Sequence, residues 1–566
     1  MKNNRAIFIF ILIILAFIIL IGRTGYLQIF KWREKSLEVQ DLSTKMITLS
    51  AKRGNIYGVN GELLAWNERQ YQIINLGQII EKDIEVKIRD VLYRSDVNIE
   101  DVIDKLNFQR RINISINPAT ARQLNNLDNI MVVERYVRKY AHESLYHVLG
   151  YVDTEGNPRS GLELVWDDIL RGDNGFRIIT RTPSGRQKSI VSESPAINGN
   201  NIYTTIDLEM QIYIYEELKK SNHLGSVILS NPKTGDIIAL VSYPSPNPNA
   251  FSRGLTNLEF RRILNDASKP LINRAISATY PPGSVFKPFV SYSALEYGVN
   301  PEDTVISTGR YSLRNSAGNV IATFSDWYTL GHGETDFIKS LRVSANTYYY
   351  DLAEKMGISF LSEKASEYKI SERTDIEIPG ERAGVFGDED WKKENLGEQW
   401  YPGETLLSFI GQGYVESTPI QMLRYYNILA TKGEYYRFNL FKNSQDLFGN
   451  IIEEKLPYLQ DRYEMNQEFL SYIYQGLYEV TTYSGGSADG GTAYESFLNY
   501  PINVAGKTGT AEVSGGRKSH AWFAGFLPIE DPEISIIVFV EHGGYGTTIA
   551  APLARKVLDF FVRWKF

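Results

Sequence analysis

The chain has 566 residues, of which 43% are hydrophobic and 22% are charged, and its formal net charge is −7. This length is too great for a single hydrophobic core, so two or more domains are expected. The absence of cysteine excludes disulfides, thiolate nucleophiles and cysteine-ligated zinc, and the negative charge argues against nucleic acid as a partner.

An apolar segment near the N-terminus is long enough to cross a membrane. Lys2 and Arg5 precede 17 uncharged residues, 6–22, and a helix of that length just spans the hydrocarbon core of a bilayer at about 1.5 Å per residue. A cleaved signal peptide is the alternative, but the run exceeds a usual signal core and no small-x-small cleavage site follows it. We therefore expect an uncleaved anchor at 6–22 behind a short tail, 1–5, and basic residues on both sides leave its orientation open.

Residues 23–200 contain short apolar runs and mixed charge. No group of side chains in this stretch forms a pattern that indicates chemistry, and nothing in it resembles a glycosyltransferase module. We expect a juxtamembrane segment and a non-catalytic domain here, and we expect the chemistry in residues 201–566.

The order of strands and helices in residues 201–566 indicates the fold class. Two apolar runs flank a turn rich in Asn, Pro and Gly, so a hairpin is predicted over 225–243, and the Lys-Thr-Gly copy at 233–235 is interpreted as part of that turn. Strands at both ends of this region with helices between them indicate an α+β fold with one mostly antiparallel sheet flanked by helices. The late strands and the last helix are predicted at 502–513, 521–527, 534–541 and 550–564.

A serine and a lysine three residues apart are the strongest candidates for chemistry. Ser284 and Lys287 follow the Tyr-Pro-Pro-Gly stretch 280–283 and open an apolar run to Tyr297, after which Gly298 provides a stop. This punctuation predicts a buried helix that begins at Ser284. Positions three apart share a helical face. A partly desolvated lysine there loses its proton far below the usual pKa of about 10.4 and can activate the serine as a nucleophile.

Alone, this pair is common by chance, and a serine at a helix start beside a solvated lysine is the simpler interpretation. Two further motifs in order favour chemistry instead. Ser344-Ala345-Asn346 follows Ser284, and Lys507-Thr508-Gly509-Thr510 lies near the C-terminus. This second Lys-Thr-Gly copy lies inside the predicted strand 502–513, where the glycine would let a ligand backbone approach closely.

The three motifs and further stretches along nearly all of the chain resemble the class B penicillin-binding proteins, and most closely the elongation-type penicillin-binding protein 2. Residues 246–251 and 400–405 resemble this type rather than the division (septal) type, which remains the alternative. The other matching stretches are 53–57, 60–65, 160–163, 204–207, 273–287, 410–414, 418–421 and 505–511.

The resemblance implies an architecture and a cellular place. Residues 201–566 would have the transpeptidase and serine β-lactamase-like fold, and residues 23–200 would include a mixed α/β pedestal domain. The tail 1–5 would be cytoplasmic, and a single-pass anchor in the cytoplasmic (inner) membrane would carry the catalytic domain on the extracytoplasmic, periplasmic side.

The resemblance also implies an activity and partners. The chain would be a peptidoglycan D,D-transpeptidase that cross-links stem peptides through a serine acyl-enzyme formed from a D-Ala-D-Ala donor. It would act in cell-wall elongation and rod-shape maintenance and be a target of β-lactams. Because it would not polymerise glycan itself, a SEDS-family glycosyltransferase, contacted through the membrane helix and pedestal, and scaffold proteins of the elongation complex are the expected partners.

Chemistry then suggests a role for each motif residue. Ser284 attacks the donor carbonyl, and Lys287 is its base. Ser344 relays a proton toward the departing amine, while Asn346 binds the substrate backbone and helps to hold Lys287. Lys507 supplies positive potential for the substrate carboxylate. The remaining expected substrate contacts are Thr508, Gly509 and Thr510, and by resemblance the backbone amides of Ser284 and Thr510 form the oxyanion hole.

β-Lactam hydrolysis, β-lactam sensing and a catalytically silent scaffold are the other functions considered. A class A β-lactamase needs a separate carboxylate base, but no Glu-x-x-Leu-Asn element lies between Asn346 and Lys507, and Glu404 fits the transpeptidase pattern. A sensor would need several membrane helices and an intracellular effector. A silent scaffold would have lost a motif residue, and none is missing, so cross-linking is favoured.

Some members of the family that the chain resembles carry a metal bound by Asp, His and Cys near the active site. By resemblance, Asp326 and His332 correspond to the Asp and His ligands of those members. The chain has no cysteine, however, and two ligands alone rarely hold zinc. We predict no metal and no cofactor, and we interpret the two residues as a hydrogen-bonded pair beside the cleft. The Ser- and Gly-rich stretch 483–491 is predicted to be a mobile loop that covers the cleft.

Overall fold

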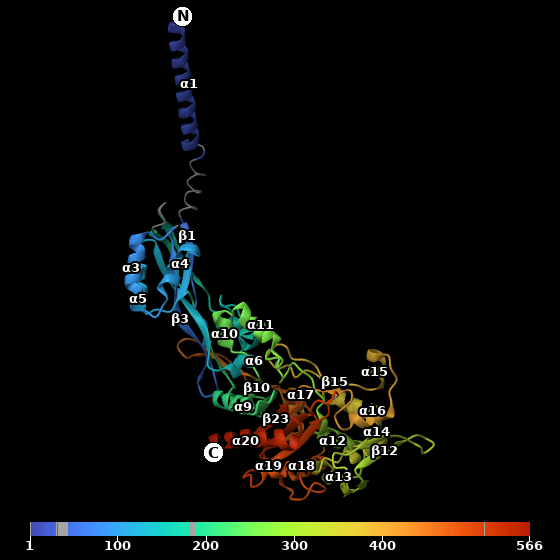
Figure 1. Cartoon of the computed structure of the whole chain (residues 1–566). Coiled ribbons are helices and arrows are strands. Elements are labelled where there is room, and N and C mark those ends of the chain that lie inside the picture. Colours follow the sequence, from blue (N-terminus) through green and yellow to red (C-terminus); the bar gives the residue numbers. More distant parts are fainter. Residues whose placement is uncertain are drawn as a thin grey trace. The chain divides into compact units, whose positions relative to one another are not determined.

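The structure is a computed structural model that describes residues 2–29, 31, 44–77, 79–181, 187–513 and 515–565. The chain forms two compact units (Figure 1). The first consists of Met1–Arg53, Asn67–Val137 and Arg171–Gly199, and the second consists of Gly54–Trp66, Arg138–Leu170 and Asn200–Phe566.

The first unit begins with the long helix α1 (Lys2–Ile29). Its segment Ile7–Ile29 has a mean hydropathy of 2.9, and none of the most apolar window is buried against other residues. An apolar helix that packs against nothing is suited to a lipid environment, so α1 fits a single membrane anchor. It extends further than the predicted span of 6–22, and it is the one such helix among the residues that the structure describes.

The rest of the first unit is a mixture of helices and strands. A three-stranded antiparallel sheet is formed by β1 (Thr44–Leu49), β6 (Gly175–Arg181) and β7 (Gln187–Ser194). Helices α3 (Lys82–Leu92), α4 (Ile99–Phe108) and α5 (Pro118–Asn125) bury their apolar faces in one core with Ile73 and Ile112. These last two residues belong to β3 (Leu63–Asn75) and β4 (Arg111–Ile114), and β3 also pairs with β5 (Ile130–Tyr140).

The second unit is built around a five-stranded sheet in the order β10-β9-β23-β22-β21, with every neighbouring pair antiparallel. The predicted hairpin is confirmed, because β9 (Gly225–Ser230) turns into β10 (Ile237–Tyr243). The three late strands are also confirmed, as β21 (Ala505–Ala511), β22 (His520–Leu527) and β23 (Ile534–Val540). The strand with the second Lys-Thr-Gly copy, β21, is therefore an edge of the sheet.

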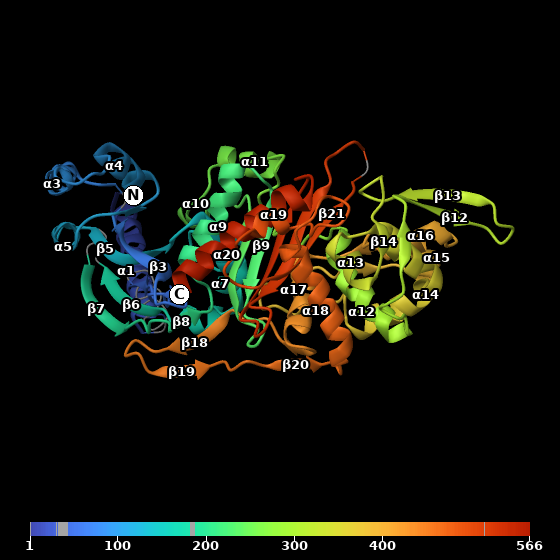
Figure 2. The ribbon, with the colours of Figure 1, turned by 90° about the horizontal axis from the view of Figure 1, so that it is seen from below.

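The sheet separates two hydrophobic cores because successive side chains of a strand point to opposite faces. Ile536 and Val538 of β23 pack in one core with α9 (Leu208–Ser221) and α20 (Ala551–Lys565). Ile537 and Phe539 face the other core, which contains helices α12 (Lys287–Tyr297), α17 (Pro419–Ala430) and α18 (Gln467–Thr482). Figure 2 shows this sheet between its covering helices. The predicted α+β class, a mostly antiparallel sheet flanked by helices, is confirmed.

Other elements of the second unit surround this framework. Those that bear on the site are α13 (Phe337–Arg342), α14 (Asn346–Glu367), the hairpin β12 (Arg310–Arg314) and β13 (Val320–Ser325), and the π-helical turn η3 (Gly546–Ala550). The remaining longer ones are α10 (Pro248–Arg253), α11 (Asn257–Asn265), α15 (Glu389–Leu396), α16 (Pro402–Ser408), β8 (Asn201–Thr204), β18 (Phe441–Gln445), β19 (Ile451–Glu454) and β20 (Leu459–Arg462).

Candidate active site

Ser284 lies in a short 3₁₀ turn, η2 (Gly283–Phe286), that runs directly into α12. The prediction that the α-helix itself begins at the serine was therefore wrong by one turn. The reason is Pro288, which has no N–H to donate to the Ser284 carbonyl four residues earlier. That carbonyl accepts the Lys287 N–H instead, which closes a tighter turn. Gly298 ends α12 with a positive φ of 100°, as its predicted stop role requires.

Two glycines let η2 lie directly against β21. Gly283 has a φ of +55°, and a Cβ there would come within 2.8 Å of the Thr510 carbonyl oxygen. On the strand side, a Cβ at Gly509 would come within 3.0 Å of Val285 Cγ1. The close approach that the sequence predicted for Gly509 is thus made by the serine segment itself. Trp522 Nε1 donates to the Pro281 carbonyl at 3.1 Å and helps to hold this segment on the sheet.

Lys287 is completely buried and points to the second motif. Its Nζ donates to the Ser344 carbonyl at 2.8 Å and to Asn346 Oδ1 at 2.7 Å, and it lies 3.2 Å from Ser344 Oγ. Burial lowers the pKa of Lys287 to about 7, and the negative charge of Asp326 partly offsets this effect. A neutral amine has two N–H groups and one lone pair, so the Ser344 hydroxyl can donate to it while the two other contacts are kept.

The second motif is presented by a strained turn between α13 and α14. Ser344 has a positive φ of 60°, which is uncommon outside glycine. Asn346 is the first residue of α14. Asp326 holds the start of this helix, because its Oδ2 accepts from the Thr347 N–H and from Thr347 Oγ1, both at 3.0 Å. This arrangement places the side chains of Ser344 and Asn346 beside Lys287.

The third motif lies on the edge strand β21, and its lysine is completely buried. Lys507 Nζ donates to the Thr508 carbonyl at 3.2 Å. Burial, together with the charge of Lys287, lowers the pKa of Lys507 well below its usual range. A carboxylate bound nearby would raise the pKa of Lys507 and favour its charged form. The Thr508 hydroxyl donates to Thr492 Oγ1 at 2.7 Å, and Thr510 Oγ1 accepts from the Gly546 N–H at 3.1 Å.

One cavity of about 580 Å³ collects most of these groups. Five of the predicted site residues line it, whereas Lys287 and Lys507 are buried behind its surface and Gly509 does not line it. The cavity also brings in residues that sequence reasoning did not select, including Thr492, Gln412 and Glu512. The full lining is Ser284, Ser325, Asp326, Trp327, Ser344, Asn346, Ile410, Gln412, Thr492, Thr508, Thr510, Glu512, Ser519, Tyr545 and Thr547.

Asp326 and His332 do not form a complete metal site. His332 Nε2 lies 3.8 Å from Asp326 Oδ1, so the direct hydrogen bond that the sequence predicted is absent and the contact is ionic at most. The Asp326 oxygens accept instead from Thr347 and from the Trp327 N–H, and His332 Nδ1 lies 2.9 Å from the Ala488 carbonyl. Because a carbonyl only accepts, that nitrogen carries the proton. The chain supplies no cysteine as a third ligand, so these residues do not fit the Asp, His and Cys set.

The stretch 483–491, predicted as a mobile loop, is tied to α13 by Arg342 and by Lys339, whose Nζ lies 3.2 Å from Asp489 Oδ1. Arg342 Nε donates to the Asp489 carbonyl at 2.8 Å, and its terminal nitrogens contact Asp489 Oδ1 at 2.6 Å and Glu479 Oε2 at 2.7 Å. The guanidinium carbon also lies 3.8 Å from the ring centroid of Tyr483. These contacts argue against a freely moving loop, and they hold its last residues at the edge of the cavity.

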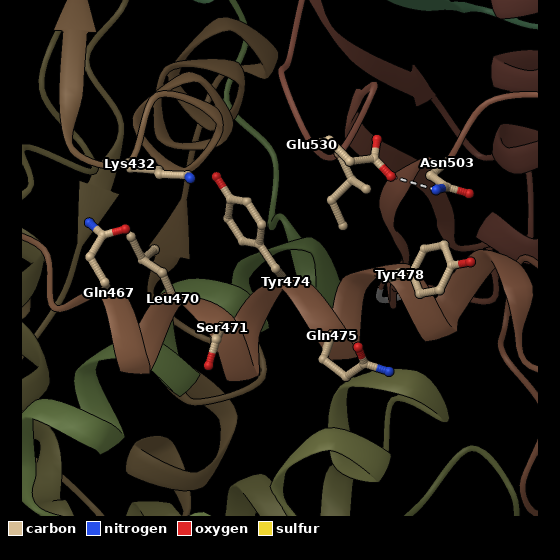
Figure 3. A pocket seen from close by; sticks show the side chains of 10 residues that line it. Lys432, Gln467, Leu470, Ser471, Tyr474, Gln475, Tyr478, Asn503 and Glu530 are labelled. Atoms are coloured by element: carbon tan, nitrogen blue, oxygen red, sulfur yellow. Dashed lines mark hydrogen bonds between the residues drawn. The ribbon is translucent and has the colours of Figure 1, made fainter.

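Two other features lie apart from this chemistry. Glu404 does not line the cavity, and its Oε1 accepts from the buried Lys392 Nζ at 2.5 Å. A second cavity of about 490 Å³ is lined by side chains of α18 and of neighbouring loops (Figure 3). There Asn503 Nδ2 donates to Glu530 Oε1 at 2.5 Å, and none of the motif residues takes part in its lining. The cavity around Ser284 is therefore the candidate active site.

The fold and the site together define a class of protein. A serine on a tight turn, a buried lysine of lowered pKa three residues later and a polar edge strand packed against the turn are the parts of a serine acyltransferase with a lysine base. They are carried by an antiparallel sheet between two helical layers.

Comparison with known proteins identifies the family. Residues 225–559 match the family described as the penicillin binding protein transpeptidase domain, and residues 48–204 match the penicillin-binding protein dimerisation domain. The peptidoglycan D,D-transpeptidase MrdA of Escherichia coli K12 is 30% identical over 98% of this chain and 93% of the relative. The chain belongs to the class B penicillin-binding proteins, in the elongation-type penicillin-binding protein 2 group, and it is a serine-type peptidoglycan D,D-transpeptidase.

Solved structures agree with this assignment. Penicillin-binding protein 2 of Helicobacter pylori, in its complex with MreC, has a TM-score of 0.75 and 26% identity, covering 92% of this chain and 99% of that chain. A chain from a structure titled "Structural coordination of polymerization and crosslinking by a peptidoglycan synthase complex" has a TM-score of 0.72 and 26% identity, covering 98% and 97%. The predicted transpeptidase fold with an accompanying pedestal domain is confirmed.

Proposed function

We propose that Ser284 is the nucleophile of the cross-linking reaction and that Lys287 is its base. The observation that carries this proposal is the burial of Lys287 among polar partners one turn after the serine, with a pKa of about 7. A lysine of that pKa is substantially neutral at physiological pH and can accept the hydroxyl proton.

In the first half of the reaction, Ser284 Oγ bonds to the carbonyl carbon of the penultimate D-alanine of the donor, and the peptide bond to the terminal D-alanine breaks. The serine proton passes to Lys287 and then, through the Ser344 hydroxyl, to the leaving amine. Asn346 keeps Lys287 in place through its Oδ1. The products are a serine ester and free D-alanine, so atoms and charges balance.

In the second half, an acceptor amine attacks the ester carbonyl carbon and loses a proton to Lys287, and Ser284 leaves as a hydroxyl. The backbone N–H groups of Ser284 and Thr510 are proposed to stabilise the oxyanion in both halves. Support comes from the close contact between η2 and the edge strand β21, which brings the two backbones together. Lys507 is proposed to supply positive potential behind the strand, with Thr508 to Thr510 contacting the substrate.

The cavity favours transfer over hydrolysis. Its two carboxylates are Asp326, whose oxygens accept hydrogen bonds from the backbone and from Thr347, and Glu512, which is exposed. Asp326 is buried but its oxygens are committed to these donors, and Glu512 is exposed, so neither is placed to activate water as a class A β-lactamase would require. A β-lactam is therefore expected to acylate Ser284 and to leave slowly.

We further propose a domain assignment and a location. Residues 6–22 would lie within a single anchor in the cytoplasmic membrane, with 1–5 on the cytoplasmic side, 23–200 as the juxtamembrane segment and pedestal, and 201–566 as the catalytic domain on the periplasmic side. The unburied apolar helix α1 and the separate family matches at 48–204 and 225–559 support this arrangement.

The proposed partners follow from the chemistry and from the relatives. Cross-linking needs newly polymerised glycan, so a SEDS-family glycosyltransferase, contacted through the membrane helix and pedestal, is proposed beside the chain. Scaffold proteins of the elongation complex are proposed as well. The similar proteins include one solved with MreC and one from a complex that combines polymerization with crosslinking, which supports both proposals.

The test is the intact mass of the full-length chain in detergent after mixing with benzylpenicillin, compared with Ser284→Ala. We expect a slowly released one-to-one adduct on Ser284 that the variant lacks. Rapid turnover of the drug would instead identify a β-lactamase, and an unmodified wild-type chain would contradict the assignment of the nucleophile.

A further inference from the structure

The buried amine of Lys287 lies over the face of an aromatic ring. Its Nζ is 4.7 Å from the ring centroid of Tyr349 on α14, and both side chains are completely buried. A protonated amine at this distance is attracted to the negative face of the ring, and the attraction is strongest where water is excluded. A neutral amine carries no charge for the ring to attract. The ring therefore distinguishes between the two protonation states of Lys287.

Two helices hold the ring in this position. On α12, Ser291 lies one turn after Lys287, and its Oγ is 2.8 Å from the Tyr349 hydroxyl. On α14, Tyr349 lies three residues after Asn346, whose Oδ1 accepts from Lys287, so both side chains of that helix face the lysine. Burial raises the pKa of Tyr349, so the phenol stays neutral and acts on Lys287 through its π face rather than as an anion.

Two ionisable groups on other elements also act on Lys287. Burial lowers the pKa of Lys287 to about 7, and Asp326, directly after β13, partly offsets this effect. Lys507 on β21 is the second group, and a charge on either lysine disfavours a charge on the other. When Lys287 takes the serine proton, it therefore becomes an ammonium group in a place where burial and Lys507 both oppose the charge. The ring of Tyr349 acts in the same direction as Asp326 and favours that charge.

We propose that Tyr349 is a positioning residue of the reaction, whose ring faces the Lys287 amine and stabilises the ammonium group that forms when Lys287 takes the serine proton. This inference rests on the proposed role of Lys287 as the base. The interaction strengthens as the reaction proceeds, because the amine is neutral before the proton transfer and charged after it. Tyr349 thus makes Lys287 a stronger base than it would be in a purely aliphatic surrounding.

The test is the pH profile of acylation of the full-length chain in detergent by benzylpenicillin. Tyr349→Leu keeps an apolar side chain but removes the π face. We expect the midpoint of its profile to move about half to one pH unit toward acid, and the rate on the alkaline plateau to fall about three- to tenfold. Tyr349→Phe keeps the ring and loses only the hydroxyl beside Ser291, so its midpoint should stay within about 0.2 pH unit of wild type.

The direction of the shift separates this role from a merely structural one. A substitution that only loosens the packing admits water, which weakens desolvation and moves the midpoint toward alkaline pH. Tyr348→Leu, at the neighbouring buried tyrosine of α14, is the matched control, and its midpoint should equal that of wild type. If Tyr349→Leu does not fold, pentafluorophenylalanine at position 349 keeps an aromatic ring but reverses its charge distribution, and the same acid shift is expected.

Three results would overturn the proposal. They are an unchanged or alkaline midpoint when the π face is removed or reversed, an acid shift of Tyr349→Phe as large as that of Tyr349→Leu, and the same acid shift in Tyr348→Leu. Each of these is measured against a wild-type profile with its midpoint near neutral pH. A wild-type profile without that midpoint would instead contradict the proposed role of Lys287 as the base, so the two failures are distinguishable.

Discussion

At the scale of single residues, Lys287, the proposed base, shows how burial lowers the pKa of an amine. Its pKa of about 7 means that the fraction of neutral amine changes steeply around physiological pH. Since only the neutral form accepts the Ser284 proton, the second-order rate constant for acylation by benzylpenicillin should rise about tenfold from about pH 6 to pH 8 and then level off. A stopped-flow or quenched-mass pH profile measures this directly.

The neighbouring charge provides a control on that profile. Asp326 raises the pKa of Lys287, so Asp326→Asn should move the midpoint of the pH profile to lower pH. A wild-type rate that still climbs tenfold per pH unit near pH 9 would mean that the base has the ordinary lysine pKa and that burial does not set it.

Lys507 is a second residue whose proposed function opposes stability. Burial and the charge of Lys287 lower its pKa, so the folded chain binds this proton less readily than the unfolded chain, whose lysine titrates near 10.4. Lys507→Met should therefore stabilise the fold by about 1–4 kcal/mol near neutral pH while lowering acylation about a hundredfold. The gain in Tm should shrink as the pH approaches 10, where the unfolded lysine also loses its proton. A lower Tm at pH 7 would show that Lys507 is a net stabilising contact.

At the scale of elements, two segments far apart in sequence touch because both lack side chains at the contact. Gly283 combines a φ of +55° with a Thr510 carbonyl oxygen 2.8 Å from the position of a Cβ. Gly283→Ala should lower both Tm and the acylation rate, because the turn that bears Ser284 must move away from β21. Gly298→Ala is the matched control, since Gly298 also has a positive φ but nothing within 4 Å of its Cβ position.

The comparison of the two variants isolates the effect of the steric clash between a Cβ at Gly283 and the Thr510 carbonyl. Gly298→Ala should cost only the backbone penalty of about 1 kcal/mol and leave acylation unchanged. Thermal unfolding and benzylpenicillin acylation of both variants measure the difference. Equal effects of the two substitutions would mean that η2 and β21 separate without consequence.

The elements also show where sequence reasoning succeeds. The hairpin 225–243, the three late strands and the last helix were predictable, because their periodicity and turn residues are local. Ser284, Lys287 and Lys507 could be selected from the sequence because they belong to known motifs that follow one another in a known order. Thr492 was not predicted as a lining residue, because its position depends on hydrogen bonds to Arg342 and Thr508, which no local sequence pattern encodes. The 3₁₀ turn was missed because it depends on one absent N–H at Pro288.

At the scale of the whole molecule, the chain combines an anchor with a catalytic unit that contains its own site. Every residue that lines the cavity lies between Ser284 and Thr547, and α1 contributes none of them. A chain that begins at residue 44 should therefore be soluble without detergent and be acylated by benzylpenicillin within about twofold of the full-length rate.

Cross-linking in cells should respond differently to the same truncation. A membrane anchor raises the effective concentration of the enzyme near membrane-bound partners. Truncation removes this effect without changing the active site. The truncated chain should thus fail to support growth of a strain depleted of its own transpeptidase. Fusing the truncated chain to an unrelated membrane helix then tests whether α1 acts only as a tether. Restored growth would mean that α1 only tethers the enzyme, whereas continued failure with a normal acylation rate would mean that α1 makes a specific contact with the proposed polymerase partner. A truncated chain that is acylated far more slowly than full length would contradict the self-contained site.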